Sequence, residues 1–241
     1  MTILLTGITG LLGSEIKKLI PQSISPTHKE LDINDKYCAL EFIKKEKITE
    51  VIHTAAIASV ARCDKDKQGA WQANVEGTRN LVDALKTHAE KGYFIYISTA
   101  CVFRGDESMY TEESIPDPVN FYAMTKLVGE TIVQSLSNHL IIRTNFVGKR
   151  KWPYRKAFTD RFGTYLFADD VALGIRELYA SKLTGIVHLV GDRVFSMFDI
   201  AKMTTHEIEP MTLKDYSGPH VTVNMTLDSK RWKKYTISKV N

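Results

Sequence analysis

The sequence predicts an α/β fold in which a doubly wound parallel sheet is followed by a smaller portion of mixed structure. Three observations support this prediction. Short apolar runs alternate with amphipathic helical segments as far as Arg143, a glycine-rich turn joins the first strand to the first helix, and the alternation breaks up after Arg143. Continuous apolar runs suit strands that are buried on both faces, and regular strand–helix alternation favours a parallel sheet covered on both sides.

The predicted strands are the short apolar runs of the chain. We place them at residues 2–6, weakly around Ile24, and at 50–53, 93–98, 139–143 and 185–189. The predicted helices carry apolar residues at helical spacing, as at Leu12 and Ile16, and cover 11–20, 36–47, 70–89, 121–135, 169–181 and 196–203. Pro21 ends the first helix because proline cannot donate the next helical hydrogen bond, and Ser196 suits an N-cap.

The composition is that of an ordinary globular protein. Hydrophobic residues make up 44% and charged residues 25% of the 241 residues, and no apolar run approaches the ~20 residues that a membrane span requires. The N-terminus enters a strand without a basic segment or a cleavage site. The cysteines, Cys38, Cys63 and Cys101, are irregularly spaced, so we expect no disulfides and no metal site. Together with the lack of an apolar span and of a cleavage site, this spacing leads us to expect no membrane partner and a cytoplasmic location.

Two basic and aromatic clusters contrast with the modest net charge of +4. One covers residues 149–162 and the other covers residues 230–235. Each is compatible with a solvated surface, with a site for the diphosphate of a nucleotide-linked substrate, or with a nucleic-acid contact. The first two interpretations are favoured, and we expect no nucleic-acid partner.

The glycine-rich turn has the spacing and context of a phosphate-binding loop. Gly7, Gly10 and Gly13 follow the first strand and open the first helix. Gly7 allows a tight turn, Gly10 lets the backbone approach a pyrophosphate, and Gly13 lets the helix pack closely on the strand. The amides of Leu11 and Leu12 then point at the phosphates from the helix N-terminus. The sequence therefore predicts a Rossmann-type dinucleotide site.

A second motif, Tyr122 followed by Lys126, places a phenol and an ammonium one turn apart on one helix face. A phenol with a pKa near ~10 is a poor acid–base group at neutral pH, and a nearby ammonium is expected to lower that pKa. Thr99 ends the fourth apolar strand, at the edge where open α/β sheets bind ligands. These residues predict a proton donor beside the dinucleotide.

Several motifs in a fixed order give a resemblance to a known superfamily. They are GxxGxxG at 7–13, HTAA at 53–56, NVEGT at 74–78, YxxxK at 122–126 and RTN at 143–145. Their order and spacing are similar to those of the extended branch of the short-chain dehydrogenase/reductase superfamily. Within this branch, LDIND at 31–35, STACVFRG at 98–105 and YTEE at 110–113 resemble the dTDP-4-dehydrorhamnose reductase family. The resemblance covers about residues 1–148 well and the remainder loosely.

The resemblance implies an NAD(P)H-dependent reductase of a 4-keto nucleotide sugar that forms a homodimer. Thr99 would hold the substrate oxygen, Tyr122 would donate the proton, and Lys126 would tune Tyr122 and contact the nicotinamide ribose. Residues 1–148 would form the NAD(P)-binding Rossmann portion. Residues 149–241 would form a smaller, interleaved substrate-binding portion, with a soft boundary between the two.

The predicted binding residues follow from these motifs and from the segment after the second strand. The cofactor set contains Gly7, Thr9, Gly10, Leu11, Leu12, Gly13, Lys29, Asp32, Ile33, Ala55, Ala56, Ile57, Asn74, Ser98, Tyr122, Lys126 and Thr144. Of these, Ser98 is also compatible with a structural hydroxyl at the strand end. The substrate set contains Val102, Phe103, Trp152, Arg155 and Lys156.

The segment ~20 residues after the first glycine favours NADP(H) over NAD(H). A carboxylate there would accept from the ribose 2′-hydroxyl, and residues 25–29 carry none. Lys29 is suited to pair with a 2′-phosphate. Glu30 and Asp32 lie just beyond and leave NAD(H) open, although the resemblance places Asp32 near the adenine.

Two other functions stay open. One is a nucleotide-sugar epimerase or dehydratase that retains NAD, although Ala100 and Cys101 stand where a dehydratase usually has acidic residues. The other is a non-catalytic cofactor-binding regulatory subunit, like that of methionine adenosyltransferase, which shares this fold. The segment between Gly148 and Phe167 is shorter than in the family, which leaves a smaller or altered substrate open.

Two further groups of polar residues receive structural interpretations. His53 ends a buried strand, so we expect a hydrogen-bonded structural residue and neither a catalytic group nor a metal ligand. Asp169 and Asp170 are expected to supply an N-cap and a first-turn acid to the following helix.

Overall fold

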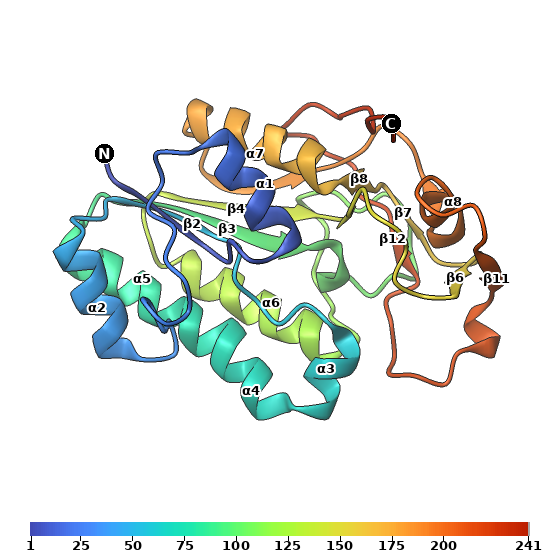
Figure 1. Ribbon diagram of the computed structural model, residues 1–241, viewed down its shortest axis with the longest axis horizontal. Helices are drawn as coiled ribbons and strands as arrows, with labels where there is room; N and C mark the ends of the chain where they lie inside the picture. The colour runs from blue at the N-terminus through green and yellow to red at the C-terminus, as the bar shows by residue number, and fades with distance from the viewer. Residues whose placement is uncertain (241) are drawn as a thin grey trace.

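The computed structural model describes residues 1–240 and has a five-stranded sheet at its centre. Its strands are all parallel and follow the order β1, β2, β3, β4, β9 (Figure 1). Every residue of the first three is buried, as expected for a sheet that is covered on both faces. The predicted α/β class is confirmed. The strands are β1 Ile3–Thr6, β2 Glu50–His53, β3 Tyr93–Thr99, β4 His139–Thr144 and β9 Gly185–Leu189.

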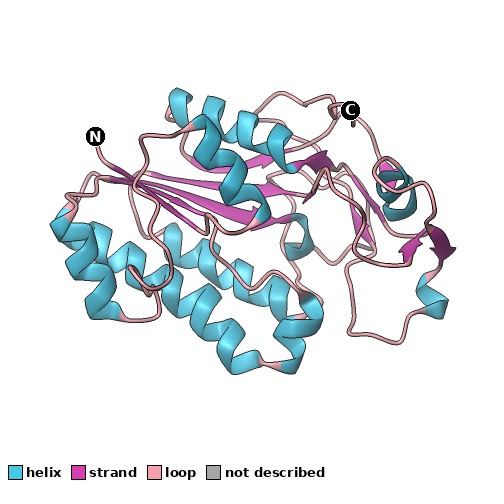
Figure 2. Cartoon of the chain, in the orientation of Figure 1, coloured by secondary structure: helices cyan, strands magenta, loops and turns pink. Residues whose placement is uncertain are grey.

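Helices cover both faces of this sheet (Figures 1 and 2). Because side chains alternate along a strand, Ile3 and Leu5 pack in the core on one face while Leu4 packs in the core on the other. The first face carries α1 Leu11–Leu19 and α7 Ala168–Ser181, and the second carries α2 Lys36–Lys45, α5 Gly77–His88 and α6 Phe121–Val133. Within residues 1–240, no helix combines the length and apolar character needed to cross a membrane.

The chain reverses its direction across the sheet after β1. α1 leads to Ile24, which forms a single parallel bridge with Leu4, and α2 then leads to β2 on the other side of β1. The second strand predicted at Ile24 is reduced to this bridge, since Pro26 has no amide to extend the ladder. A reversal of this kind leaves a crevice at the carboxyl end of the central strand, where ligands bind in open α/β sheets.

The helix predicted over residues 70–89 is interrupted. A π-helical turn at Gln72–Glu76 joins α4 Lys67–Trp71 to α5, and α3 Val60–Lys65, which was not predicted, precedes them. Ser59 caps α3 by accepting from the Arg62 amide at 3.2 Å. π turns inside helices frequently occur at functional sites.

Short strands build the C-terminal portion. Ser196 caps α8 Met197–Lys202 as predicted, but the N-cap of α7 is Phe167, because Asp169 and Asp170 already lie in the first helical turn. α7 and β9 follow residue 148 and still belong to the central layers, so the chain passes between the two portions. The short elements are η2 Ala100–Val102, β5 Phe146–Val147, β6 Lys156–Phe158, β7 Phe162–Gly163, β8 Leu166–Phe167, β10 Phe195–Ser196, β11 Glu209–Met211, η3 Leu213–Asp215 and β12 Asn224–Met225.

Candidate functional site

The backbone of the glycine loop packs so closely on its neighbours that a side chain would not fit at Gly7 or Gly13. Gly7 has a φ of +77°, and a Cβ at this residue would lie 2.5 Å from Thr54 Oγ1. A Cβ on Gly13 would lie 2.2 Å from the Gly7 carbonyl oxygen, so α1 packs on the loop only with glycine at this position. The Gly10 amide donates to the same carbonyl at 2.9 Å and closes the turn. The turn and packing roles predicted for Gly7 and Gly13 are confirmed.

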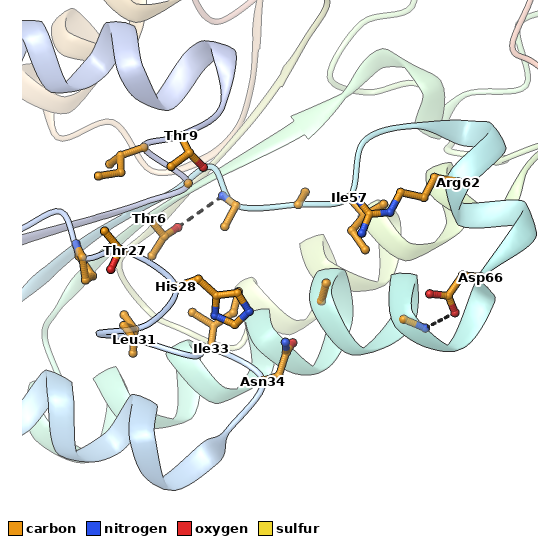
Figure 3. Close-up of a pocket in the computed structure, with 17 residues that line it drawn as sticks. Thr6, Thr9, Thr27, His28, Leu31, Ile33, Asn34, Ile57, Arg62 and Asp66 are labelled. Carbon is orange, nitrogen blue, oxygen red and sulfur yellow. Dashed lines mark hydrogen bonds between the residues drawn. The ribbon is translucent and has the colours of Figure 1, made fainter.

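A cavity of about 410 Å³ opens beside this loop, at the carboxyl ends of β1 and β2 (Figure 3). The loop amides at one end suit phosphate oxygens, and the aliphatic side chains at the other end suit a flat purine. Gly10 and Gly13 adjoin the cavity through the turn, and the Leu12 side chain is buried in the sheet core. The members of the predicted cofactor set that line the cavity are Gly7, Thr9, Ile33, Ala55, Ala56 and Ile57.

Lys29 and Asp32 lie outside the cavity lining. Lys29 is exposed, and Asp32 Oδ1 accepts from the Asn34 amide at 3.0 Å, which shapes the turn before α2. In their place His28 and Arg62 line the cavity, and Figure 3 shows these two side chains on different sides of it. Sequence reasoning missed Arg62 because α3 is too short to produce a recognisable period.

Two of the three predicted catalytic residues, Thr99 and Tyr122, meet at the carboxyl end of β3. Thr99 is buried there, and its Oγ1 accepts from the Cys101 amide at 3.1 Å. Asn120 starts α6 by accepting from the Ala123 amide at 2.9 Å, which places Tyr122 in the first turn of the helix. Tyr122 packs against the buried cluster that contains Cys101, at the end of β3.

Burial governs the acidity of the Tyr122 phenol. Desolvation raises the pKa of Tyr122, the neighbouring Cys101 adds to that increase, and hydrogen bonding with Thr99 opposes it. The predicted lowering of the pKa of Tyr122 is not found in this structure, because the cost of burying a phenolate outweighs the hydrogen bond with Thr99, which is the favourable contribution. The Tyr122 phenol is protonated at neutral pH, as a proton donor must be, but the raised pKa makes it a weaker acid than a free phenol.

Lys126 is itself perturbed by burial. Its side chain is 3% exposed, and its Nζ lies 4.0 Å from the centroid of the Tyr96 ring. Burial lowers the pKa of Lys126 to about 7, and Glu130, one turn further along α6, opposes this decrease. The ammonium is consequently poised between its charged and neutral forms near neutral pH.

Asn74 links the cavity to the catalytic helix. Its Oδ1 accepts from the Ile57 amide at 2.7 Å, and its Nδ2 donates to the Ile57 carbonyl and to Thr125 Oγ1, both at 3.0 Å. Thr125 Oγ1 in turn donates to the Tyr122 carbonyl at 2.7 Å. Asn74 lies in the π-helical turn, so this irregular turn fixes the loop after β2 against α6.

Three other polar residues near the strand ends have defined partners or surroundings. The Ser98 hydroxyl donates to Glu130, and Thr144 Oγ1 is buried without a hydrogen bond in residues 1–240. His53 contacts Thr6 Oγ1 at 2.7 Å and Thr78 Oγ1 at 3.1 Å, and burial lowers its pKa to about 3. His53 is therefore a neutral, hydrogen-bonded residue between β1 and α5, as predicted.

Comparison with known proteins places the chain in a family. Residues 1–234 match the family model described as the RmlD substrate binding domain. The chain belongs to this family. The dTDP-4-dehydrorhamnose reductase of Aggregatibacter actinomycetemcomitans is 28% identical over 83% of this chain and 76% of that protein. The methionine adenosyltransferase 2 subunit beta of Bos taurus is 32% identical over 95% of this chain and 80% of that protein.

The other matches agree with this assignment to the RmlD family. The methionine adenosyltransferase 2 subunits beta of rat and mouse are 34% identical over 57% of this chain, and the match spans only 43% of their length. A crystal structure of a dTDP-4-dehydrorhamnose reductase from Clostridium acetobutylicum superimposes with a TM-score of 0.86 and 25% identity, covering 95% of this chain and 90% of that chain. The predicted family resemblance is confirmed.

In this RmlD-family chain, the predicted substrate residues lie in two separate places. Val102 and Phe103 are fully buried behind the end of β3, where the Phe103 ring stacks on Tyr110 with centroids 4.5 Å apart. Trp152, Arg155 and Lys156 lie at β6, in the outer part of the C-terminal portion (Figure 1).

The side chains of Trp152 and Arg155 already have partners. Trp152 Nε1 donates to the Lys156 carbonyl at 3.3 Å, and Arg155 pairs with Glu209 at 2.7 Å. The Arg155 side chain is 83% exposed, so its charge is screened by water. The structure thus does not bring this group to Tyr122.

Proposed function

We propose that this RmlD-family protein is an oxidoreductase that reduces the ketone of a 4-keto nucleotide sugar, with NADPH favoured over NADH. The observation that supports this function is the position of Thr99 and Tyr122 at the carboxyl end of β3, with Lys126 one turn further along α6, at the edge of the sheet where the cavity of the glycine loop opens. Proton donor and cofactor cavity thus share one edge of the sheet.

The proposed chemistry assigns one task to each residue. Thr99 Oγ1 orients the ketone oxygen, and the Tyr122 hydroxyl, which is protonated at neutral pH, donates its proton to that oxygen as the hydride arrives at the carbon. Lys126, one turn further along the same helix, is assigned the task of supplying a positive charge that offsets the phenolate left after proton transfer. A nicotinamide cofactor held by the glycine loop, Ala55 and Ile57 would supply the hydride.

The substrate class is supported by the relatives. One is named dTDP-4-dehydrorhamnose reductase, and a second, from Streptomyces niveus and 26% identical over 83% of this chain, is named dTDP-4-keto-6-deoxy-D-glucose reductase. Both names describe reductases of dTDP-linked keto sugars. We extend this class to the present chain, which retains the residues of the proposed chemistry at Thr99, Tyr122 and Lys126.

A second candidate function is a cofactor-binding regulatory subunit. The match to the methionine adenosyltransferase 2 subunit beta of Bos taurus, 32% identical over 95% of this chain, favours it specifically. A protein in this role would bind the dinucleotide in the same cavity and form a complex with a catalytic subunit. It would need no turnover by Tyr122.

Turnover assays with a panel of 4-keto nucleotide sugars test the proposal. We expect the protein to oxidise one equivalent of NADPH for each keto sugar reduced. Interconversion of sugars without net loss of NADPH would indicate an epimerase. A protein that binds NADPH, consumes none with any sugar and binds a methionine adenosyltransferase catalytic subunit tightly would support the regulatory function and contradict the reductase proposal.

The choice between NADPH and NADH tests the cavity lining. We expect Arg62→Gln to raise the KM for NADPH about 10-fold or more while the KM for NADH changes little, because Arg62 lines the cavity and retains its positive charge. Lys29→Gln is the matched control, since Lys29 lies outside the lining and should leave both constants within a few-fold. If instead Lys29→Gln raised the KM for NADPH and Arg62→Gln did not, Lys29 would be the residue that binds the 2′-phosphate. Steady-state kinetics of wild type and both variants measure the KM for each cofactor.

A further inference from the structure

Arg161 presents a guanidinium without an acidic partner in the C-terminal portion. It precedes β7 and is half-buried, and its Nε donates to the Thr222 carbonyl at 2.8 Å. Its terminal nitrogens contact thioether sulfurs, Nη1 at 3.2 Å from Met197 Sδ and Nη2 at 3.3 Å from Met225 Sδ. Arg161 forms no ion pair with any residue in the described part of the chain.

This guanidinium lies close to the proposed catalytic residues. Met225 Sδ, which Arg161 contacts, also lies 3.5 Å from Cys101 Sγ. The Cys101 amide donates to Thr99 Oγ1 at 3.1 Å. The Met225 side chain therefore lies between Arg161 and Cys101, and Cys101 contacts Thr99, the residue proposed to hold the ketone oxygen.

Tyr165 adds a second polar group without a partner at the same place. Its side chain is 4% exposed, and its hydroxyl makes no hydrogen bond within residues 1–240. Burial raises the pKa of Tyr165, and the charge of nearby Arg161 opposes this increase, while Cys101 adds to it. The Tyr165 side chain belongs to the same buried cluster as Cys101 and Met225, the methionine that Arg161 contacts, and a buried hydroxyl without a partner carries a free-energy cost that a ligand can remove.

The contacts of Arg161 use only part of the hydrogen-bonding capacity of its half-buried guanidinium. A thioether sulfur is a weak acceptor, so Met197 and Met225 leave most of the donor capacity of the guanidinium unused. Arginine cannot lose its charge, and its planar fork matches the two oxygens of a carboxylate or phosphate. The buried Arg143 already has such a partner in Glu130, and Arg104 has Asp117.

We propose that Arg161 and Tyr165 form an oxyanion-binding subsite that holds an anionic group of the keto substrate beside the reacting carbon. The shared chemistry is a pair of oxygens with negative charge, which a phosphate of the nucleotide diphosphate or a carboxylate on the sugar supplies. The identity of the substrate rests on the proposed function, whereas binding of the oxyanion does not require turnover. The subsite makes Arg161, and not Arg155, the basic residue that selects charged substrates.

Calorimetric titration of the NADPH-loaded protein tests the subsite with two probes, dTDP for the diphosphate and D-glucuronate for the carboxylate. We expect wild type to bind one of them, and Arg161→Gln to weaken that binding about 10–100-fold. Arg161→Lys should give a smaller loss, because it keeps the charge but not the fork. Tyr165→Phe should weaken the same probe a few-fold.

Arg231→Gln is the matched control. Arg231 also bonds to main-chain carbonyls in the C-terminal portion, those of Thr184 and Ile186, but it lies by the amino end of β9, away from the site. It should leave the affinity unchanged. Thermal unfolding of each variant verifies that the fold is intact.

Two results would overturn the subsite: equal affinity of folded wild type and Arg161→Gln for both probes, or no binding of either probe to wild type. The proposed function fails separately. A protein that binds a probe through Arg161 but reduces no keto sugar keeps the subsite and loses the reductase, whereas turnover with an unchanged KM in Arg161→Gln keeps the reductase and loses the subsite.

Discussion

Replacing Tyr122 with phenylalanine is expected to lower kcat for ketone reduction about 10²–10⁴-fold, with little change in the affinity for NADPH. The variant removes the proton donor and keeps the ring that packs in the cluster at the end of β3. The cavity beside the glycine loop does not include Tyr122, so the adenosine end of the cofactor loses no contact. Single-turnover kinetics and NADPH titration of the same preparation separate the two effects.

Tyr93→Phe is the matched control for this loss. Tyr93 is a buried tyrosine at the amino end of β3, opposite Thr99, and its hydroxyl donates to the Leu183 carbonyl at 2.5 Å. Its loss should reduce stability and leave kcat within a few-fold of wild type. If Tyr122→Phe retained full turnover, another group would have to donate the proton, and the role proposed for the phenol would be abandoned.

The sheet was predictable from the sequence wherever strands are buried on both faces. Residues 50–53 and 185–189 match β2 and β9 residue for residue, because each segment has a β-branched Val–Ile or Ile–Val pair and is too short for a helix. The weak strand at Ile24 is short for a physical reason. Ile24 makes two main-chain hydrogen bonds with β1, but Pro26 lacks the amide that would extend the ladder, and the hydroxyls of Ser23 and Ser25 bond locally.

The candidate site also contains residues that the sequence predicts and residues that only tertiary packing brings together. Gly7 with Gly13, and Tyr122 with Lys126, were predictable because helix geometry and a single turn fix how the members of each pair meet. Arg161 was not, since its contact with Met225 joins residues 64 positions apart. The raised pKa of Tyr122 likewise depends on burial, which only tertiary packing decides.

Replacing Glu130 with glutamine is expected to lower the free energy of unfolding by about 3–5 kcal/mol. Glu130 Oε2 lies 2.7 Å from Arg143 Nη2, Oε1 lies 3.0 Å from Arg143 Nε, and both side chains are 2% exposed. The Ser98 hydroxyl also donates to Glu130. The glutamine amide oxygen can still accept one hydrogen bond from Arg143, but the Arg143 charge stays buried without a counter-charge, with the face of the Phe103 ring 5.1 Å away. Denaturant unfolding measures the loss.

The control is Glu209→Gln, which removes the same charge from an ion pair with Arg155 that lies on the surface. Glu209 is 43% and Arg155 83% exposed, so this loss should stay below about 1 kcal/mol. Combining Glu130→Gln with Arg143→Met should recover part of the stability, because no uncompensated charge then remains buried. Equal losses for Glu130→Gln and Glu209→Gln would mean that water reaches Arg143. In that case Glu130 would also contribute less to the positive charge of Lys126. The ion pair of Glu130 with Arg143 would then not be the rigid support for α6 that its burial indicates.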